Sequence, residues 1–339
     1  MKNLLLLFSL LFLFTNQSMA ADSSVLPKNV AVVVNTANAN SLEIGQYYLK
    51  LRNVPKENLI KVSIPNNPKK LKAEQFAKLR LEITEQLPSG IEVILLVWTA
   101  PYAVECNSIT AAFTLGYDAS QCLNTCSAGK PSAYFDSRST RPSELGLQLA
   151  MLMPTDSISM AKSVIERGVL SGFMVNEASA YFLITSDNNR SARSAFFPKS
   201  GYIAQKKLTI NTLFVDSIEY KKDIMIYQTG VVSVPNLDTL TFLPGALADH
   251  LTSTGGDLLD HTQMSSLKWL EAGATASYGS VSEPCNYWQK FSNSAVLLTH
   301  YLSGETAVEA YWKSVAWPAQ GVFIGEPLAA PYCQYCALR

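Results

Sequence analysis

The chain of 339 residues carries 27 basic and 27 acidic side chains, and 48% of its residues are hydrophobic. A neutral chain has no general electrostatic attraction for nucleic acid or for anionic lipid, so the charge balance excludes polyanion binding as a general role. At this length a single hydrophobic core can bury most of the apolar surface, so the composition favours one folded domain.

The first 20 residues are predicted to be a cleavable signal peptide. Lys2 gives a short charged start, residues 4–14 form an almost pure run of Leu and Phe, and Ser18 and Ala20 occupy the positions that a signal peptidase recognises. The apolar run is too short for a stable membrane-spanning helix, which needs about 20 residues. The pattern therefore predicts export and not a membrane anchor.

Residues 21–339 are expected to form one α/β domain in the periplasm or outside the cell. Residue 21 is Ala and not Cys, so a lipoprotein anchor is not indicated. No second apolar stretch reaches membrane-spanning length, so no integral membrane segment is expected after cleavage. Removal of the signal peptide takes away one basic residue, Lys2, and leaves a net charge of −1.

Short apolar runs that are rich in branched residues predict buried strands. These runs lie at residues 30–34, 59–64, 91–98, 181–185, 212–215, 224–227 and 274–278. Helical patterns lie between or after them, at residues 42–51, 73–87, 158–170, 264–272, 294–302 and 306–315. Strands that alternate with helices predict a three-layer α/β fold, in which helices cover both faces of a mainly parallel sheet. Functional loops are then expected at the carboxyl ends of the strands.

The segment from about residue 101 to residue 142 differs from the rest of the chain. It is rich in Ser, Thr, Asn and Cys and has little periodicity, so it is predicted to be a long loop excursion at the surface. An even number of cysteines in an exported chain suggests disulfides, because that compartment is oxidising. Three of the six cysteines, Cys106, Cys122 and Cys126, lie in this segment, and a disulfide among them would hold it in place.

Cys333 and Cys336 have the spacing of a redox motif at the end of the chain. They do not lie between a strand and a helix, and no His follows for haem attachment. A disulfide that closes or ties down the tail is therefore favoured over redox chemistry.

Four sequence blocks carry a resemblance to a bacterial family. They lie at residues 33–60, 243–253, 273–286 and 309–328, and include Leu243-Pro244-Gly245-Ala246 and Glu283-Pro284-Cys285-Asn286. With these blocks the chain resembles a widespread family of exported bacterial proteins known as conserved hypothetical proteins. The resemblance covers nearly the whole chain after the signal peptide and implies export, but it implies no particular activity.

The C-terminal third is also similar in its order of motifs to gingipain-type cysteine peptidases, which have a caspase-like α/β fold. The matching pieces are Ala272-Gly273-Ala274, residues 304–310 and Gly325-Glu326-Pro327. This resemblance implies a hydrolase-like domain with a His-Gly after one strand and a Cys after the next. This chain has residues 227–231 at the first place, with no histidine, and residues 246–253 at the second, with no cysteine. The usual catalytic dyad is therefore predicted to be absent.

A different cysteine–histidine pair is the leading catalytic hypothesis. His250 follows a short apolar run and Cys285 follows the strand predicted at 274–278, so parallel strands would bring both to one edge of the sheet. An imidazole beside a thiol can generate the reactive thiolate, and Asp249 or Glu283 could orient that imidazole.

The alternative is a non-catalytic protein on the same fold, which binds a peptide or protein or associates with the cell envelope. In that interpretation Cys285 forms a disulfide with Cys333 or Cys336, or is buried, and His250 caps or packs a helix start. The sequence leaves open whether the chain is an enzyme. The state of the Cys285 sulfur separates the two hypotheses.

Two further site chemistries have weaker patterns, and no metal or cofactor is predicted. Ser253 or Ser282 could act with His250 or His261, but neither serine lies in a Gly-x-Ser-x-Gly turn. A divalent cation could be held by acidic and histidine donors, but their spacing matches no established metal motif. Those donors are Asp249, His250, Asp257, Asp260 and His261.

The last quarter of the chain is dense in aromatic residues. They could line a groove for peptide or glycan, but large rings more often fill the space between helix and sheet. They are Tyr278, Tyr287, Trp288, Tyr311, Trp312 and Trp317.

Overall fold

The computed structural model describes residues 25–172, 175–260 and 262–333. The predicted signal peptide, His261 and Cys336 lie outside the described residues. Among the helices of the described part, none combines the length and the apolar character needed to cross a bilayer.

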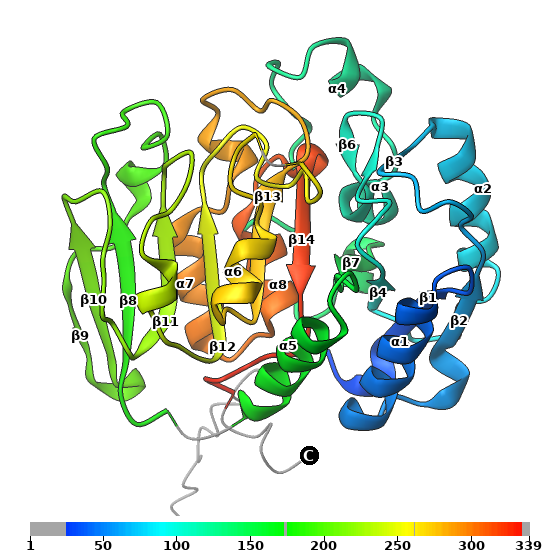
Figure 1. The fold of residues 1–339 in the computed structure, drawn as a ribbon, viewed down its shortest axis with the longest axis horizontal. Helices are drawn as coiled ribbons and strands as arrows, with labels where there is room; N and C mark the ends of the chain where they lie inside the picture. Colours follow the sequence, from blue (N-terminus) through cyan, green and yellow to red (C-terminus); the bar gives the residue numbers. More distant parts are fainter. Residues whose placement is uncertain (1–24, 173–174, 261, 334–339) are drawn as a thin grey trace, which may run out of the picture.

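One sheet of 11 strands runs through the molecule, in the order β2-β1-β4-β7-β14-β13-β12-β11-β8-β10-β9 (Figure 1). Two groups of parallel strands, β2-β1-β4-β7 and β13-β12-β11-β8-β10, make up most of it. β14 runs antiparallel to β13 between the two groups, and β9 runs antiparallel to β10 at one end. The strands are β1 (Val30–Asn35), β2 (Leu59–Val62), β4 (Val93–Val97), β7 (Leu149–Leu152), β8 (Ala178–Leu183), β9 (Gly201–Ile203), β10 (Leu208–Leu213), β11 (Ile224–Thr229), β12 (Phe242–His250), β13 (Ala276–Ser280) and β14 (Gly321–Gly325).

Helices cover both faces of this sheet, which confirms the predicted three-layer α/β fold. On one face α1 packs on α5 and α5 on α6, while α7 and α8 pack together on the other face, beside α3 (Figure 1). The helices are α1 (Ala39–Arg52), α2 (Ala73–Thr84), α3 (Ile109–Leu115), α4 (Ala119–Leu123), α5 (Ile158–Leu170), α6 (Leu267–Ala272), α7 (Ser294–Ser303) and α8 (Ala307–Ser314).

Continuous apolar strands explain why the sheet is covered on both sides. All six residues of β1 and all five of β4 are buried, as expected for parallel strands between two helical layers. α1 lies very close to β1, since a Cβ on Gly45 would meet the Val34 side chain at 2.2 Å. Several of the aromatic residues at the end of the chain also belong to the core, where Trp312 stacks on Phe323 with ring centroids 4.3 Å apart.

The carboxyl ends of the two parallel groups meet at one edge of the sheet, called the carboxyl edge below. Tyr102, which follows β4, donates a hydrogen bond to Asp257, which follows β12. At the opposite edge, Arg167 near the end of α5 donates to the carbonyl of Ala274, just before β13, at 2.8 Å. We call this second edge the amino edge.

The segment from 101 to 142 is only partly the surface loop that its composition predicts. It contains α3, in which six of seven residues are buried, and this helix contacts both β7 and β14. It also supplies β5 (Ala103–Val104) and β6 (Asn107–Ser108), which form a small sheet with β3 (Lys70–Leu71). The predicted disulfide within the segment joins Cys106 to Cys122.

Candidate functional site

The carboxyl edge of β11, β12 and β13 positions the residues that the sequence singles out. β11 and β12 end side by side, with Thr229 opposite His250. The loop that follows β12, residues 251–266, lies directly on β13: a Cβ on Gly256 would come within 2.4 Å of the Gly279 carbonyl oxygen. The two consecutive glycines at 255 and 256 thus allow the loop to approach the strand.

A small cleft of about 230 Å³ opens at this edge, and we call it the edge cleft. Segments that follow β8, β12 and β13 each contribute to its walls. Its lining residues are Asn189, Arg190, Leu251, Thr252, Ser253, Glu283, Pro284, Cys285, Asn286 and Phe291. Most of the side chains are amides, hydroxyls or charged groups, so the cleft suits a polar ligand.

Arg190 is anchored within the edge cleft by its neighbours. Its Nη1 lies 2.7 Å from the Asp187 carboxylate, and its Nε donates to Thr252 Oγ1 at 3.2 Å. Thr252 in turn donates to Gln263 Oε1 at 2.6 Å. The guanidinium is therefore held in a fixed orientation at the wall of the cleft.

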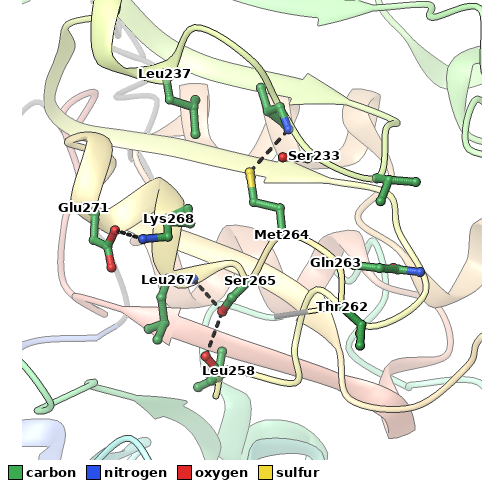
Figure 2. Close-up of a pocket in the computed structure, with 12 residues that line it drawn as sticks. Ser233, Leu237, Leu258, Thr262, Gln263, Met264, Ser265, Leu267, Lys268 and Glu271 are labelled. Carbon is green, nitrogen blue, oxygen red and sulfur yellow. Dashed lines mark hydrogen bonds and ion pairs between the residues drawn. The ribbon is translucent and has the colours of Figure 1, made fainter. Parts of the chain in front are cut away.

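A second, larger pocket of about 460 Å³ lies beside the same loop, between α6 and residues 232–237 (Figure 2). Met264 lies in the middle of this pocket, and its sulfur accepts a hydrogen bond from the Val234 backbone N–H at 3.3 Å. Gln263, the hydrogen-bond partner of Thr252, is one of its lining residues, so the two cavities share the loop 251–266.

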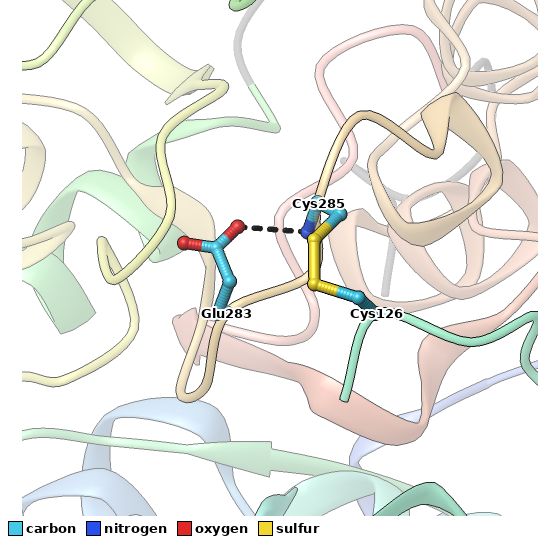
Figure 3. Close-up of side chains that lie close together, drawn as sticks. All are labelled: Cys126, Glu283 and Cys285. Carbon is cyan, nitrogen blue, oxygen red and sulfur yellow. Dashed lines mark hydrogen bonds between the residues drawn. A yellow bond between two sulfur atoms is a disulfide. The ribbon is translucent and has the colours of Figure 1, made fainter. Parts of the chain in front are cut away.

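The sulfur of Cys285 is bonded to Cys126 and is not a free thiol (Figure 3). The Cα atoms of the two residues are 5.2 Å apart, and 159 residues separate them in the sequence. A disulfide sulfur supplies no thiolate, so the predicted nucleophile is wrong for this state of the protein. The predicted pairing of Cys285 with Cys333 or Cys336 is also wrong, because its sulfur is already bonded to Cys126.

Glu283 does not orient an imidazole. It holds the backbone beside this disulfide. Its carboxylate accepts a hydrogen bond from the Cys285 backbone N–H at 2.8 Å. The Glu283 oxygen and the sulfurs of Cys126 and Cys285 lie within 4.8 Å of one another (Figure 3). Thiolates, not disulfide sulfurs, are the ligands that metals bind, so this oxidised group is not a metal site.

His250 lies at the predicted edge of the sheet, but it is buried and cannot serve as an accessible base. Its Nδ1 accepts a hydrogen bond from Trp269 Nε1 at 2.9 Å. Burial, together with the nearby positive charge of Arg193, lowers the pKa of His250 to about 3, although the Met264 backbone favours the charged form. The ring is therefore neutral near pH 7. It is part of the packed core beneath the loop that follows β12.

Asp249 does not orient His250, because it belongs to a buried ion pair with Arg193. Both side chains are 1% exposed, and Arg193 Nη1 donates directly to the Asp249 carboxylate. The carboxylate also accepts from Gln228 Nε2 at 2.8 Å and from Ser292 Oγ at 2.9 Å. Sequence reasoning missed Arg193 and Ser292, since they come from loops and match no motif.

This buried cluster has polar atoms without a partner among the described residues. They are Arg193 Nε, Gln228 Oε1 and Thr229 Oγ1. Buried polar groups are normally hydrogen-bonded, and exceptions need a physical reason. Gln228 and Thr229 lie at the carboxyl end of β11, and Arg193 lies in the segment after β8, near the residues that line the edge cleft.

The weaker serine and metal patterns do not assemble in the described residues. Ser282 Oγ donates to the Cys106 carbonyl at 2.7 Å, and Ser253 lines the edge cleft without contacting an imidazole there. Asp249 is paired with Arg193, and Asp257 lies 3.7 Å from the Lys70 ammonium, so these carboxylates serve other partners.

Fold and site together define the chain as a three-layer α/β protein with a mainly parallel central sheet. A solved structure described as "Structure of Protease" is similar to it, with a TM-score of 0.50 and 10% sequence identity. The match covers 92% of this chain and 80% of the other. No family model matches the chain, and no curated protein does either. At this identity the likeness concerns the fold alone.

Proposed function

We propose that the chain is a non-catalytic exported protein that binds a peptide in the edge cleft of a peptidase-like fold. One observation carries this proposal: Cys285, the cysteine placed at the cleft, is bonded to Cys126. The neighbouring His250 is buried, and its pKa is lowered to about 3, so it is an inaccessible and weak base, and neither half of the predicted dyad is available. The resemblance to gingipain-type peptidases would then extend to the fold but not to the catalytic cysteine–histidine dyad.

The chemistry of the cleft supports a peptide as the ligand. Asn189, Asn286 and Ser253 offer amide and hydroxyl groups that can pair with a peptide backbone, and Arg190 offers a charged donor. The similar solved structure is a protease, a class of protein whose ligands are polypeptide chains, and this agrees with a peptide in the cleft. The cleft is small, so it would hold one or two residues of such a chain.

Export is the second part of the proposal. Two disulfides occur among the described residues, Cys106–Cys122 and Cys126–Cys285. Disulfides persist mainly in oxidising compartments, which supports the periplasm or the outside of the cell. Cell fractionation of a C-terminally tagged chain, with N-terminal sequencing of the product, tests this directly: a start at Ala21 is expected, and an unprocessed cytosolic chain would contradict it.

The competing hypothesis is a cysteine peptidase that is released when Cys285 becomes a thiol. The Cys126→Ser substitution frees Cys285 alone, and the Cys122→Ser substitution frees a cysteine outside the cleft as a matched control. Hydrolysis of casein and of a fluorogenic peptide mixture is measured for both variants and for the wild type. We expect no hydrolysis in any of them, because the imidazole that would activate the thiol is buried.

Hydrolysis that appears in Cys126→Ser, is absent in Cys122→Ser and disappears in Cys126→Ser/Cys285→Ala would reverse the proposal. Binding is then measured separately, by fluorescence anisotropy with a labelled random hexapeptide library. Arg190→Ala should weaken binding at least tenfold, because a charged hydrogen bond contributes about 1.5–3 kcal/mol. Binding that is equal in Arg190→Ala and wild type would place the peptide elsewhere.

A further inference from the structure

The pocket between α6 and residues 232–237 differs from the edge cleft in its chemistry. Six of its 12 lining residues are aliphatic or thioether side chains: Val232, Val234, Leu237, Leu258, Met264 and Leu267 (Figure 2). Its volume of about 460 Å³ falls in the range of about 300–1,000 Å³ that small-ligand pockets occupy. An apolar cavity of this size at the protein surface accommodates an apolar group well.

The charges at the rim of this pocket cancel each other. Lys268 and Glu271 form an ion pair at 2.6 Å on the exposed side of α6. The other polar lining groups are mostly hydroxyls, and Ser265 Oγ is bonded to the Leu258 carbonyl at 3.1 Å. No unpaired charge therefore faces the cavity from its described lining residues, which disfavours a charged side chain as its occupant.

Met264 makes the pocket adaptable. Its backbone is fixed, since its N–H donates to the Val232 carbonyl at 3.0 Å. The side chain packs against the buried apolar residues of the adjoining core, and its sulfur accepts one weak hydrogen bond from the Val234 N–H. A methionine side chain rotates easily and fits irregular apolar partners, so it can move to contact groups of different shape.

A chain of three side chains connects this pocket to the edge cleft. Arg190 donates to Thr252, and Thr252 donates to Gln263, which lines the pocket. Gln263 also accepts from the Thr254 backbone N–H at 3.0 Å, which fixes its position in the loop. The two cavities are therefore neighbours, joined by two consecutive side-chain hydrogen bonds, which suits consecutive parts of one extended ligand.

We propose that this pocket holds a large, uncharged apolar side chain, of the Leu, Met or Phe type, from the peptide whose polar backbone lies in the edge cleft. The inference rests on the proposed function and adds the specificity of the ligand to it. The polar cleft would align the peptide, and the apolar pocket would select one of its residues. Burying such a side chain should strengthen binding by at least about tenfold, so it should dominate the choice of sequence.

The test uses labelled hexapeptide libraries in which one position is fixed as Phe, Leu, Asp or Lys. Binding to the full chain is measured for wild type, Val232→Asp and Val215→Asp. The Val232 side chain is at the mouth of the pocket, where the residue is 41% exposed, so a carboxylate there should not unfold the protein. Val215 is 42% exposed and lines none of the described pockets, which makes it the matched control.

The wild type and Val215→Asp should prefer the Phe and Leu libraries over the Asp library by at least about tenfold at one position. Val232→Asp should lose this preference and keep the Arg190-dependent binding. Binding without an apolar preference, or a preference unchanged in Val232→Asp, would overturn the inference while the proposed function stands. No binding of any library by the wild type would overturn both.

Discussion

Two arginine–carboxylate pairs, each with a buried carboxylate, lie at opposite edges of the main sheet. At the amino edge, Arg52 at the end of α1 donates two hydrogen bonds, of 2.9 and 2.6 Å, to Glu326 just after β14. Tyr48 donates a third to the same carboxylate, at 2.9 Å. At the carboxyl edge, Arg193 and Asp249 form the second pair beneath the edge cleft.

The two pairs differ in how completely their neighbours are satisfied. Among the described residues, no buried polar side-chain atom of Tyr48, Arg52 or Glu326 lacks a partner. The Glu326 carboxylate links α1, which carries Tyr48 and Arg52, to the end of β14. The cluster around Asp249 leaves Arg193 Nε and Gln228 Oε1 without partners. The Arg52–Glu326 cluster is thus satisfied by its own hydrogen bonds, whereas the Asp249 cluster retains polar capacity near the ligand site.

The largest expected effect is that of Asp249→Ala, which removes the carboxylate that pairs with the buried Arg193. An uncompensated buried charge costs about 3–5 kcal/mol in the free energy of unfolding, measured by urea denaturation. Peptide binding should fall as well, because the segment that carries Arg193 also carries Arg190. Asp238→Ala, at an exposed position, should change stability by less than about 0.5 kcal/mol.

Glu326→Ala is expected to destabilise the chain by about 3 kcal/mol, at the lower end of the same range. The Arg52 side chain retains 14% exposure and can turn its charge towards water, whereas Arg193 is enclosed. Peptide binding by the folded variant should match that of wild type, because the pair is at the opposite edge. An equal loss of binding in both variants would contradict the division of roles between the two edges.

Continuous runs of branched apolar residues made part of the fold predictable. The strands at 30–34, 91–98 and 224–227 were predicted for this reason and correspond to β1, β4 and β11. Three central strands have no such run. β7 is Leu-Ala-Met-Leu, β12 contains Pro244-Gly245, and β14 begins and ends with glycine. Pairing with neighbouring strands, and not local propensity, determines these segments.

The location of the candidate site could be predicted from the sequence, but the bonding and protonation states of its residues could not. His250 and Cys285 do lie at the carboxyl edge, because the order of strands and helices fixes where each strand ends. The disulfide partner was not predictable, since six cysteines allow 15 connectivities and Cys126 is 159 residues away. The neutrality of His250 depends on its burial and on the charge of Arg193, and both arise only through tertiary packing.

Acid should act on the two described histidines in opposite ways, and His250 should give the larger effect. Its pKa falls from 6.5 to about 3 on folding, so the unfolded chain binds the proton more readily between these values. Stability is therefore complete above pH 6.5 and is lost as the pH falls, by about 3 kcal/mol at pH 4. His250→Asn, which keeps an acceptor for Trp269, should remove this part of the acid sensitivity in urea denaturation between pH 4 and 7.

His300 provides the opposite case, with the smallest expected effect. Its ring contacts Glu305 at 2.9 Å and Asp136 at 3.2 Å. Burial alone would lower its pKa, but these carboxylates prevail and raise the pKa above 6.5. The contribution to stability is then complete below pH 6.5 and is lost as the pH rises through the folded-state value.

His300→Gln should therefore flatten the dependence of stability on pH above 6.5 and leave the dependence below 6.5 to His250. The effect is small because the Asp136 side chain is 61% exposed and solvent screens the pair. Denaturation midpoints of wild type and both variants between pH 4 and 9 separate the two slopes. A His300→Gln profile that differs from wild type only on the acid side would show that the carboxylates do not control this ring.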